Sequence, residues 1–311
     1  MHTQAETFYE ALDRCYLNGD LEGAERYLSE CAQCTDESGP SPLTLIEAFN
    51  ELGAFYRNTG WHSKSLAVFD RAKKLVEEAF GESCAEYASV LNNMAGTYRL
   101  LKDYTRAISH YQQSLDIYRR IGCGTSYTYA NVLSNLSLVF RENKQPKPAI
   151  VCLEEAIPLL EALHEHRSEI AMMYNNLTTL YYSAGDQSQA TRCLYRALQE
   201  FEACSREENE DYAPGLNSLA GFLYATGNCE SALALYRRSA KYIRRFFGET
   251  VEYEVTCQNM RWVYEKLGRH QDAILALSKA QKVYAQLFGP DHERTRAVAD
   301  DLQRLQEATS V

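Results

Sequence analysis

The chain repeats itself every 41 or 42 residues, and this period constrains the fold more than any other feature of the sequence. One small residue marks the same place in seven successive units: Ala24, Ser65, Ala107, Ala149, Ala190, Ala232 and Ala273. A fixed period of this length is typical of helical repeats, in which each unit packs mainly on its neighbours. The 311 residues are therefore not expected to surround one central core.

Two other columns keep the same register, and together they predict a pair of antiparallel helices in each unit. Four positions after the small residue stand large ones: Leu28, Phe69, Tyr111, Leu153, Leu194, Tyr236 and Leu277. Seven positions after it stand small ones again: Cys31, Ala72, Ser114, Ala156, Ala197, Ser239 and Ala280. Large side chains fill the space between helices, and small ones let two backbones approach closely.

The turns inside the units support this prediction. Most contain a glycine, as in Asn58-Thr59-Gly60 and Ala184-Gly185-Asp186, where glycine can adopt the left-handed conformation that ends a helix. The third unit has Leu101-Lys102-Asp103 instead, without glycine. Each unit is thus expected to be a helix, a short turn and a second helix.

This pattern resembles the tetratricopeptide repeat family. The resemblance rests on small residues early in the first helix (Gly53, Ala95 and Ala220) and in the second helix (Ala107 and Ser114). The units are longer than the usual length of about 34 residues. Long units of this kind occur in kinesin light chains and related bacterial proteins. They share Tyr-Ala at the start of the first helix and Phe-Gly at the end of the second, here Tyr87-Ala88, Tyr129-Ala130, Tyr212-Ala213, Phe80-Gly81, Phe247-Gly248 and Phe288-Gly289.

The resemblance implies an all-α fold, a right-handed superhelical solenoid of seven helix-turn-helix units with a C-terminal capping helix. We expect the seven units to occupy residues 1–290 and the capping helix and tail to occupy residues 291–311. A final helix of this kind covers the apolar edge that the last unit would otherwise expose.

Charge and composition exclude several classes of function. The net charge is −10, which disfavours nucleic acid and anionic lipid as partners. No apolar run is long enough to span a membrane, and the first residues lack the features of a secretory signal. The ten cysteines are spread along the chain rather than clustered, as in a protein of a reducing cytoplasm. A cytoplasmic location is therefore expected.

No catalytic pattern stands out in the sequence. There is no glycine-rich phosphate loop, no His-Glu-x-x-His and no Gly-x-Ser-x-Gly. The pair Cys31 and Cys34 has the spacing of a zinc ligand pair, but no second pair accompanies it. We therefore expect a protein that is not an enzyme and that has no catalytic residues, no metal site and no cofactor.

Asparagines recur on the first helices, where the concave face of such an array lies. Asparagine is a poor helix former, so the recurrence needs an explanation. One interpretation is that the amides bind the backbone of an extended peptide, and the other is that they bond a neighbouring helix and fix the packing of repeats. The residues assigned to peptide binding are Asn50, Asn92, Asn93, Asn135, Asn175, Asn176, Asn217 and Asn259.

A second column on the same helices changes character along the chain. It begins with Arg57, Arg99 and Arg141 and continues with Tyr182 and Tyr224. Guanidinium groups suit carboxylates, so the first half is expected to be basic and the second half aromatic. A neighbouring column adds an apolar anchor, Trp262. The arginines could instead pair with acids of the chain, such as Glu47, Glu51 and Glu142.

The leading functional hypothesis is an adaptor that binds a peptide segment or helix of a partner protein in its concave groove. The partner should carry acidic and apolar residues. The alternative is an intracellular peptide-sensing regulatory protein whose solenoid changes shape on ligand binding. The outer face leaves self-association open, and it carries a basic run that a solvated helix face would explain: Arg237, Arg238, Lys241, Arg244 and Arg245.

Overall fold

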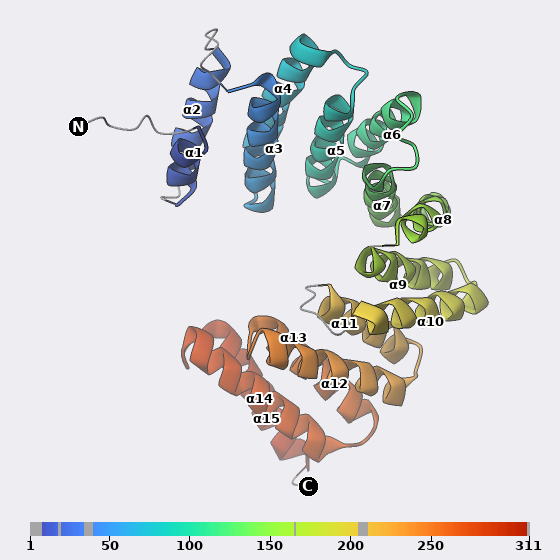
Figure 1. Cartoon of the computed structure of the whole chain (residues 1–311). Helices are drawn as coiled ribbons and strands as arrows, with labels where there is room; N and C mark the ends of the chain where they lie inside the picture. The colour runs from blue at the N-terminus through green and yellow to red at the C-terminus, as the bar shows by residue number, and fades with distance from the viewer. Residues whose placement is uncertain (1–7, 18–19, 34–39, 165, 205–210, 310–311) are drawn as a thin grey trace. The chain divides into compact units, whose positions relative to one another are not determined.

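The computed structural model describes residues 8–17, 20–33, 40–164, 166–204 and 211–309, and these form helices joined by turns (Figure 1). No strand occurs in these ranges. The helices are α1 Phe8–Leu17, α2 Leu21–Gln33, α3 Pro42–Asn58, α4 His62–Phe80, α5 Ala85–Leu100, α6 Tyr104–Arg120, α7 Tyr127–Glu142, α8 Pro146–Leu163, α9 Arg167–Ser183, α10 Gln187–Cys204, α11 Tyr212–Ala225, α12 Cys229–Phe246, α13 Val251–Lys266, α14 His270–Phe288 and α15 Glu293–Thr309.

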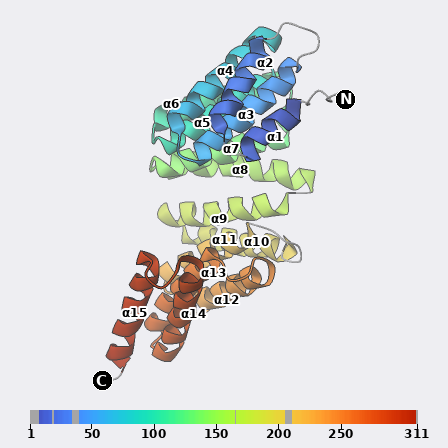
Figure 2. The ribbon, with the colours of Figure 1, turned by 90° about the vertical axis from the view of Figure 1, so that its left-hand side faces the viewer.

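The described helices form consecutive hairpins, α1 with α2 through α13 with α14, followed by α15. The predicted all-α fold of helix-turn-helix units with a C-terminal helix is therefore confirmed. The contacts divide the chain into two compact units, residues 1–162 and 163–311. In the second unit α15 packs beside α14 at the C-terminal end (Figure 2). The expected division at residue 290 stays a prediction.

The small-residue column lies in the tightest part of the packing. All seven residues of this column are fully buried, with none of their surface exposed: Ala24, Ser65, Ala107, Ala149, Ala190, Ala232 and Ala273. Two serines of the column seven positions later bond the neighbouring first helix: Ser114 Oγ donates to Ala88 O at 2.7 Å, and Ser239 Oγ donates to Ala213 O at 3.2 Å. A hydroxyl fits there because it is small and because the carbonyl satisfies it.

The turns without glycine have the same geometry as those with it. Gly60 has a φ of 85°, and Lys102 takes the equivalent place with a φ of 61°. The next residue, Asp103, caps α6, because its carboxylate accepts the amide hydrogen of Arg106 at 3.1 Å. The third repeat therefore keeps a sharp turn, although its lysine must adopt the left-handed backbone conformation, which is unfavourable for residues other than glycine.

Candidate functional site

In the first compact unit, residues 1–162, asparagines on the first helices of neighbouring repeats form hydrogen bonds with one another. Asn93 Nδ2 on α5 donates to Asn50 Oδ1 on α3 at 3.1 Å. Asn135 Nδ2 on α7 donates to Asn92 Oδ1 on α5 at 3.3 Å and to Asn131 Oδ1 at 2.9 Å. These are the bonds that the packing interpretation requires. The side chains of the first four remain partly exposed, so peptide binding by the same amides stays a prediction.

One asparagine of the second unit, Asn175, lies deeper than those of the first. Asn217 Nδ2 donates to Thr256 Oγ1 at 2.8 Å, which joins α11 to α13. Asn175 is only 3% exposed, so its side chain lies within the packing between helices. The Oδ1 atoms of Asn175 and Asn217 are buried without a hydrogen bond. Asn176 and Asn259 are half-buried.

The three arginines have different surroundings although they share one column. Arg99 on α5 forms an ion pair with Glu142 on α7, with Nη1 and Oε1 2.5 Å apart. This is one of the internal pairs that the sequence allowed. Arg141 is exposed. Only Arg57 combines partial burial with a guanidinium that has no carboxylate within ion-pair distance among the described residues.

Arg57 lies over a glycine and close to a buried phenol. A Cβ placed on Gly96 would lie 3.0 Å from Arg57 Nη1 and 3.6 Å from the hydroxyl of Tyr111. Burial lowers the pKa of the Arg57 guanidinium, Tyr111 raises it, and the positive charge of Arg99 lowers it. Burial raises the pKa of Tyr111 to about 12, so this phenol stays neutral. The result is a half-buried cation with no paired anion in the part of the chain that the structure describes.

The second unit carries the predicted aromatic side chains. Tyr182 on α9 is 41% exposed and meets the ring of Phe222 on α11 edge to face, with centroids 5.1 Å apart. The Lys266 ammonium lies 4.7 Å from the centre of the Tyr224 ring. Trp262 is 49% exposed.

Trp262 is covered on one face by the Arg261 guanidinium, whose carbon lies 3.6 Å from the ring centre. The exposed aromatic surface of this unit is therefore bordered by cations from α13, Arg261 and Lys266.

Two contributors to these surfaces were missed from the sequence, although a signal exists for both. Tyr111 was assigned to packing alone, yet its hydroxyl reaches Gly96 on the first helix. Tyr236 reaches Gly221 in the same way, 3.5 Å from where a Cβ would lie. Among the repeats, glycine occupies the first-helix position of Gly96 and Gly221 only where the second helix has a tyrosine, Tyr111 or Tyr236. This pairing is visible in the sequence.

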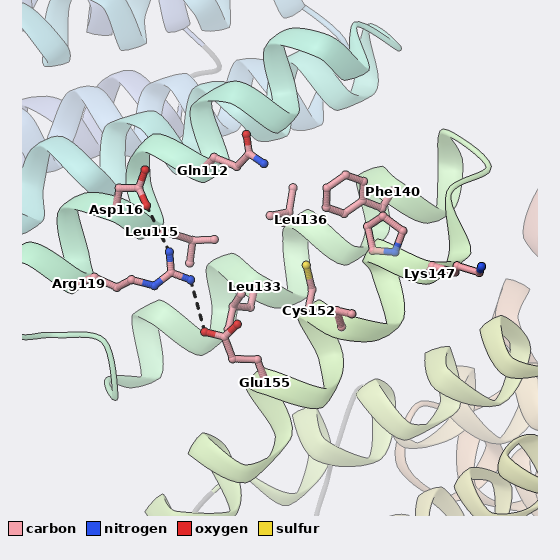
Figure 3. Close-up of a pocket in the computed structure, with 12 residues that line it drawn as sticks. Gln112, Leu115, Asp116, Arg119, Leu133, Leu136, Phe140, Lys147, Cys152 and Glu155 are labelled. Carbon is pink, nitrogen blue, oxygen red and sulfur yellow. Dashed lines mark hydrogen bonds and ion pairs between the residues drawn. The ribbon is translucent and has the colours of Figure 1, made fainter.

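A hollow of about 620 Å³ lies away from these residues, between α6, α7 and α8 of the first unit (Figure 3). Leu115, Leu133 and Leu136 are among its apolar residues. At its rim Arg119 lies between two carboxylates, 3.2 Å from Asp116 and 3.5 Å from Glu155. Lys147 is a second cation of the lining, so positive and negative charges balance and give no sign of the ligand that the hollow would prefer.

The described residues contain neither a cluster of metal ligands nor a membrane-spanning helix. Three or more histidines, cysteines or carboxylates that could hold a metal ion do not come together there. None of the helices described is both long enough and apolar enough to cross a membrane.

One buried carboxyl, Glu254 on α13, carries a stability prediction. It is fully buried; Gln258 donates to its Oε1, and its Oε2 has no hydrogen bond. Burial raises its pKa above the ordinary value of 4.5, against the opposing effects of Tyr284, Gln258 and Arg294. The stability that its proton confers is complete below pH 4.5 and is lost as the pH rises through the raised pKa.

Glu254→Gln is therefore expected to stabilise the chain at pH 7 by about 1 kcal/mol, because an uncharged amide replaces a desolvated carboxylate. Thermal unfolding at pH 7 and pH 4 measures this, and the gain should be smaller at pH 4. Glu252→Gln, on the exposed face of the same helix, is the control. An equal change in both variants would contradict the prediction.

Comparisons with known proteins agree with the repeat geometry. Profiles of the tetratricopeptide repeat match residues 44–120 and 86–162, and again 170–202 and 216–250, which is more than half of the chain. The chain belongs to the tetratricopeptide repeat family. Proteins of this family generally mediate protein–protein interactions.

A curated relative shows the resemblance at the level of sequence. The chain is 21% identical over 308 residues to the Protein KINESIN LIGHT CHAIN-RELATED 3 of Arabidopsis thaliana. The match covers 95% of this chain and 46% of the relative, so the chain spans less than half the length of that protein.

Two solved structures share the fold. BtubC (BKLC) from P. vanneervenii is 24% identical, with a TM-score of 0.56 over 64% of this chain and 80% of that one. Aspartyl phosphate phosphatase F from Bacillus subtilis is 18% identical, with a TM-score of 0.59 over 90% of this chain and 69% of that one. At these identities the likeness concerns the fold alone.

Proposed function

We propose that the chain is a protein-interaction adaptor and that Arg57 binds an acidic side chain of a partner's peptide segment. The observation that carries this proposal is the half-buried Arg57 guanidinium, which has no carboxylate partner among the described residues. Removing a cation from water without an anion to compensate is costly. A carboxylate that docks there offsets this cost and forms a charge-assisted hydrogen bond.

Two neighbours of Arg57 suit such a ligand. Gly96 has no side chain, so the guanidinium can lie directly against the α5 backbone at this point. The neutral Tyr111 phenol is close enough to offer a hydroxyl to a bound oxygen. Arg99 is partly neutralised by Glu142 and contributes a weaker field.

The second unit supports a separate part of the proposal. Tyr182, Tyr224 and Trp262 present aromatic surface to solvent and would take apolar or aromatic side chains of a partner. The alternative function, a peptide sensor that changes shape, gains no support from the contacts described. The adaptor function is therefore the one we propose.

A library of random twelve-residue peptides, selected on the wild-type protein, tests the proposal. The selected peptides should be rich in aspartate and glutamate. Arg57→Met should weaken their binding by at least about tenfold, which corresponds to about 1.4 kcal/mol. Because the unpaired charge is lost, the same variant should unfold at an equal or higher temperature than the wild type.

Two further variants sharpen this test. Gly96→Ala should also weaken binding, since its methyl group would lie 3.0 Å from Arg57 Nη1 and displace the guanidinium while leaving its charge in place. Arg120→Met, at an exposed position on α6, should have no effect. Peptides without acidic enrichment, or equal binding by the Arg57 and Arg120 variants, would refute the proposal.

A further inference from the structure

Five cations lie along α12 in the second unit, in a chain whose net charge is −10. Arg237, Lys241, Arg244 and Arg245 are exposed, and Arg238 is half-buried. Spacings of four and seven residues place Arg237, Lys241 and Arg244 on one side of the helix. The sequence alone favoured a solvated helix face, so the contacts of each cation decide whether that explanation is sufficient.

The first two cations already have partners. Arg237 donates to the Tyr264 hydroxyl through Nε at 3.2 Å and Nη2 at 3.1 Å. Arg238 donates to the Tyr212 hydroxyl at 2.8 Å and to Glu202 at 3.0 Å. These two side chains hold α12 against α13 and α11, and their role is accounted for by packing.

The remaining three cations differ from these. Arg244 is 3.7 Å from Glu249, which is a loose ion pair. Lys241 and Arg245 form no ion pair with any described residue. Cations in the last turn of a helix interact favourably with the helix dipole, which explains Arg244 and Arg245 but not Lys241, one turn earlier.

The three cations border a shallow hollow. The hollow has a volume of about 320 Å³ and is lined by Ala240, Lys241, Arg244, Arg245 and Tyr253. Ala240 and Tyr253 are almost fully buried, 9% and 6% exposed. A small side chain and a ring thus form the base, and three positive groups form the rim.

We propose that this hollow and the adjoining cations are a second docking surface, which binds an acidic segment of a partner protein. From Lys241 to Arg245 the helix rises about 6 Å, which an extended chain covers with about two residues. Two successive carboxylates in such a stretch match Lys241, Arg244 and Arg245. The proposal does not depend on the Arg57 site, because its residues lie in the other compact unit.

Charge distribution favours a protein segment over nucleic acid. A nucleic acid presents a long line of phosphates and is held by cations spread along a face. Here the unpaired cations are confined to two turns of one helix, and the chain as a whole would repel a long polyanion. A short acidic peptide needs only the local patch.

Fluorescence-labelled octaglutamate is the probe, measured by anisotropy at two salt concentrations. Lys241→Glu/Arg245→Glu should weaken its binding at least about tenfold, and higher salt should weaken wild-type binding. Lys279→Glu/Lys282→Glu, on exposed positions of α14, makes the same change in net charge and should have a small effect. Lys241→Gln/Arg245→Gln provides a milder variant, and circular dichroism checks that both remain helical.

Three results would overturn the inference. One is equal weakening by the α12 and α14 reversals, because net charge alone would then explain binding. Another is loss of octaglutamate binding in Arg57→Met with no change in the α12 variants, which would leave the Arg57 proposal standing. A third is tighter binding of an eight-nucleotide oligothymidylate than of octaglutamate, abolished by the α12 reversal, which would make the surface a nucleic-acid site.

Discussion

Gly215→Ala is expected to destabilise the chain by about 2–3 kcal/mol, although alanine is the better helix former. A Cβ on Gly215 would lie 2.0 Å from Cζ of Phe201, a ring with no exposed surface. Phe201 meets Tyr212 edge to face, with centroids 6.1 Å apart, and has little freedom to move. Overpacking a closed core costs about 1–3 kcal/mol or more, which outweighs a gain in helix propensity of about 1 kcal/mol.

Urea unfolding followed by circular dichroism measures the effect, and the same helix supplies the control. A Cβ on Gly221 would meet only the Tyr236 hydroxyl, at an ordinary 3.5 Å. Gly221→Ala should therefore stabilise the chain by up to about 1 kcal/mol. Adding Phe201→Leu to Gly215→Ala should recover part of the loss, because a smaller side chain relieves the clash. Two alanine variants of equal stability would contradict this account of the packing.

Arg261→Met is expected to cost about 2 kcal/mol and to loosen α15. Arg261 is 8% exposed and joins two carboxylates: its Nη1 lies 3.0 Å from Glu265 on α13, and its Nη2 lies 3.3 Å from Asp301 on α15. Removing the guanidinium leaves both carboxylates partly buried without their shared cation, which strongly destabilises the folded chain. Hydrogen exchange should report faster exchange of α15 amides, since this contact ties the last helix to α13.

Arg304→Met is the matched control, because Arg304 contacts the same Asp301 carboxylate from an exposed position on α15. Exposed pairs three residues apart on a helix contribute little, so this variant should stay within about 0.5 kcal/mol of the wild type. Similar losses of unfolding free energy in the two variants would contradict the prediction, because the buried and the exposed ion pair would then contribute equally to stability. Unchanged α15 exchange in Arg261→Met would show that the helix is held by other contacts.

Most of the fold could be predicted from the sequence, because the repeat period averages over local exceptions. The column of small residues that includes Ser65 and Ala107 predicted where helices approach most closely, and both residues are fully buried. The missing glycine at Lys102 did not break the pattern, since a cap by Asp103 and a left-handed lysine preserve the turn. The division into two compact units had no such signal, because the period continues through it.

The candidate site could be predicted only by helix face and residue type. Arg57 and Arg99 occupy the same column, yet only Arg99 has an acid 43 positions later, Glu142, where Arg57 has Leu100. Whether an asparagine bonds a ligand or a neighbouring helix depends on distances of a few tenths of an ångström, which no pattern encodes. Asn175 shows the difference, since a residue placed on the groove by its column is buried.

The asparagine bonds of the first unit also bear on how such an array can grow. The α5 helix carries both halves of one bond type: Asn93 donates to the helix before it, and Asn92 accepts from the helix after it. A duplicated copy of this repeat would present Asn93 to the Asn92 of its own parent and would form the same bond again. The third repeat is therefore compatible with itself at this bond, so lengthening the protein by gene duplication at this point would keep the asparagine link between neighbouring first helices.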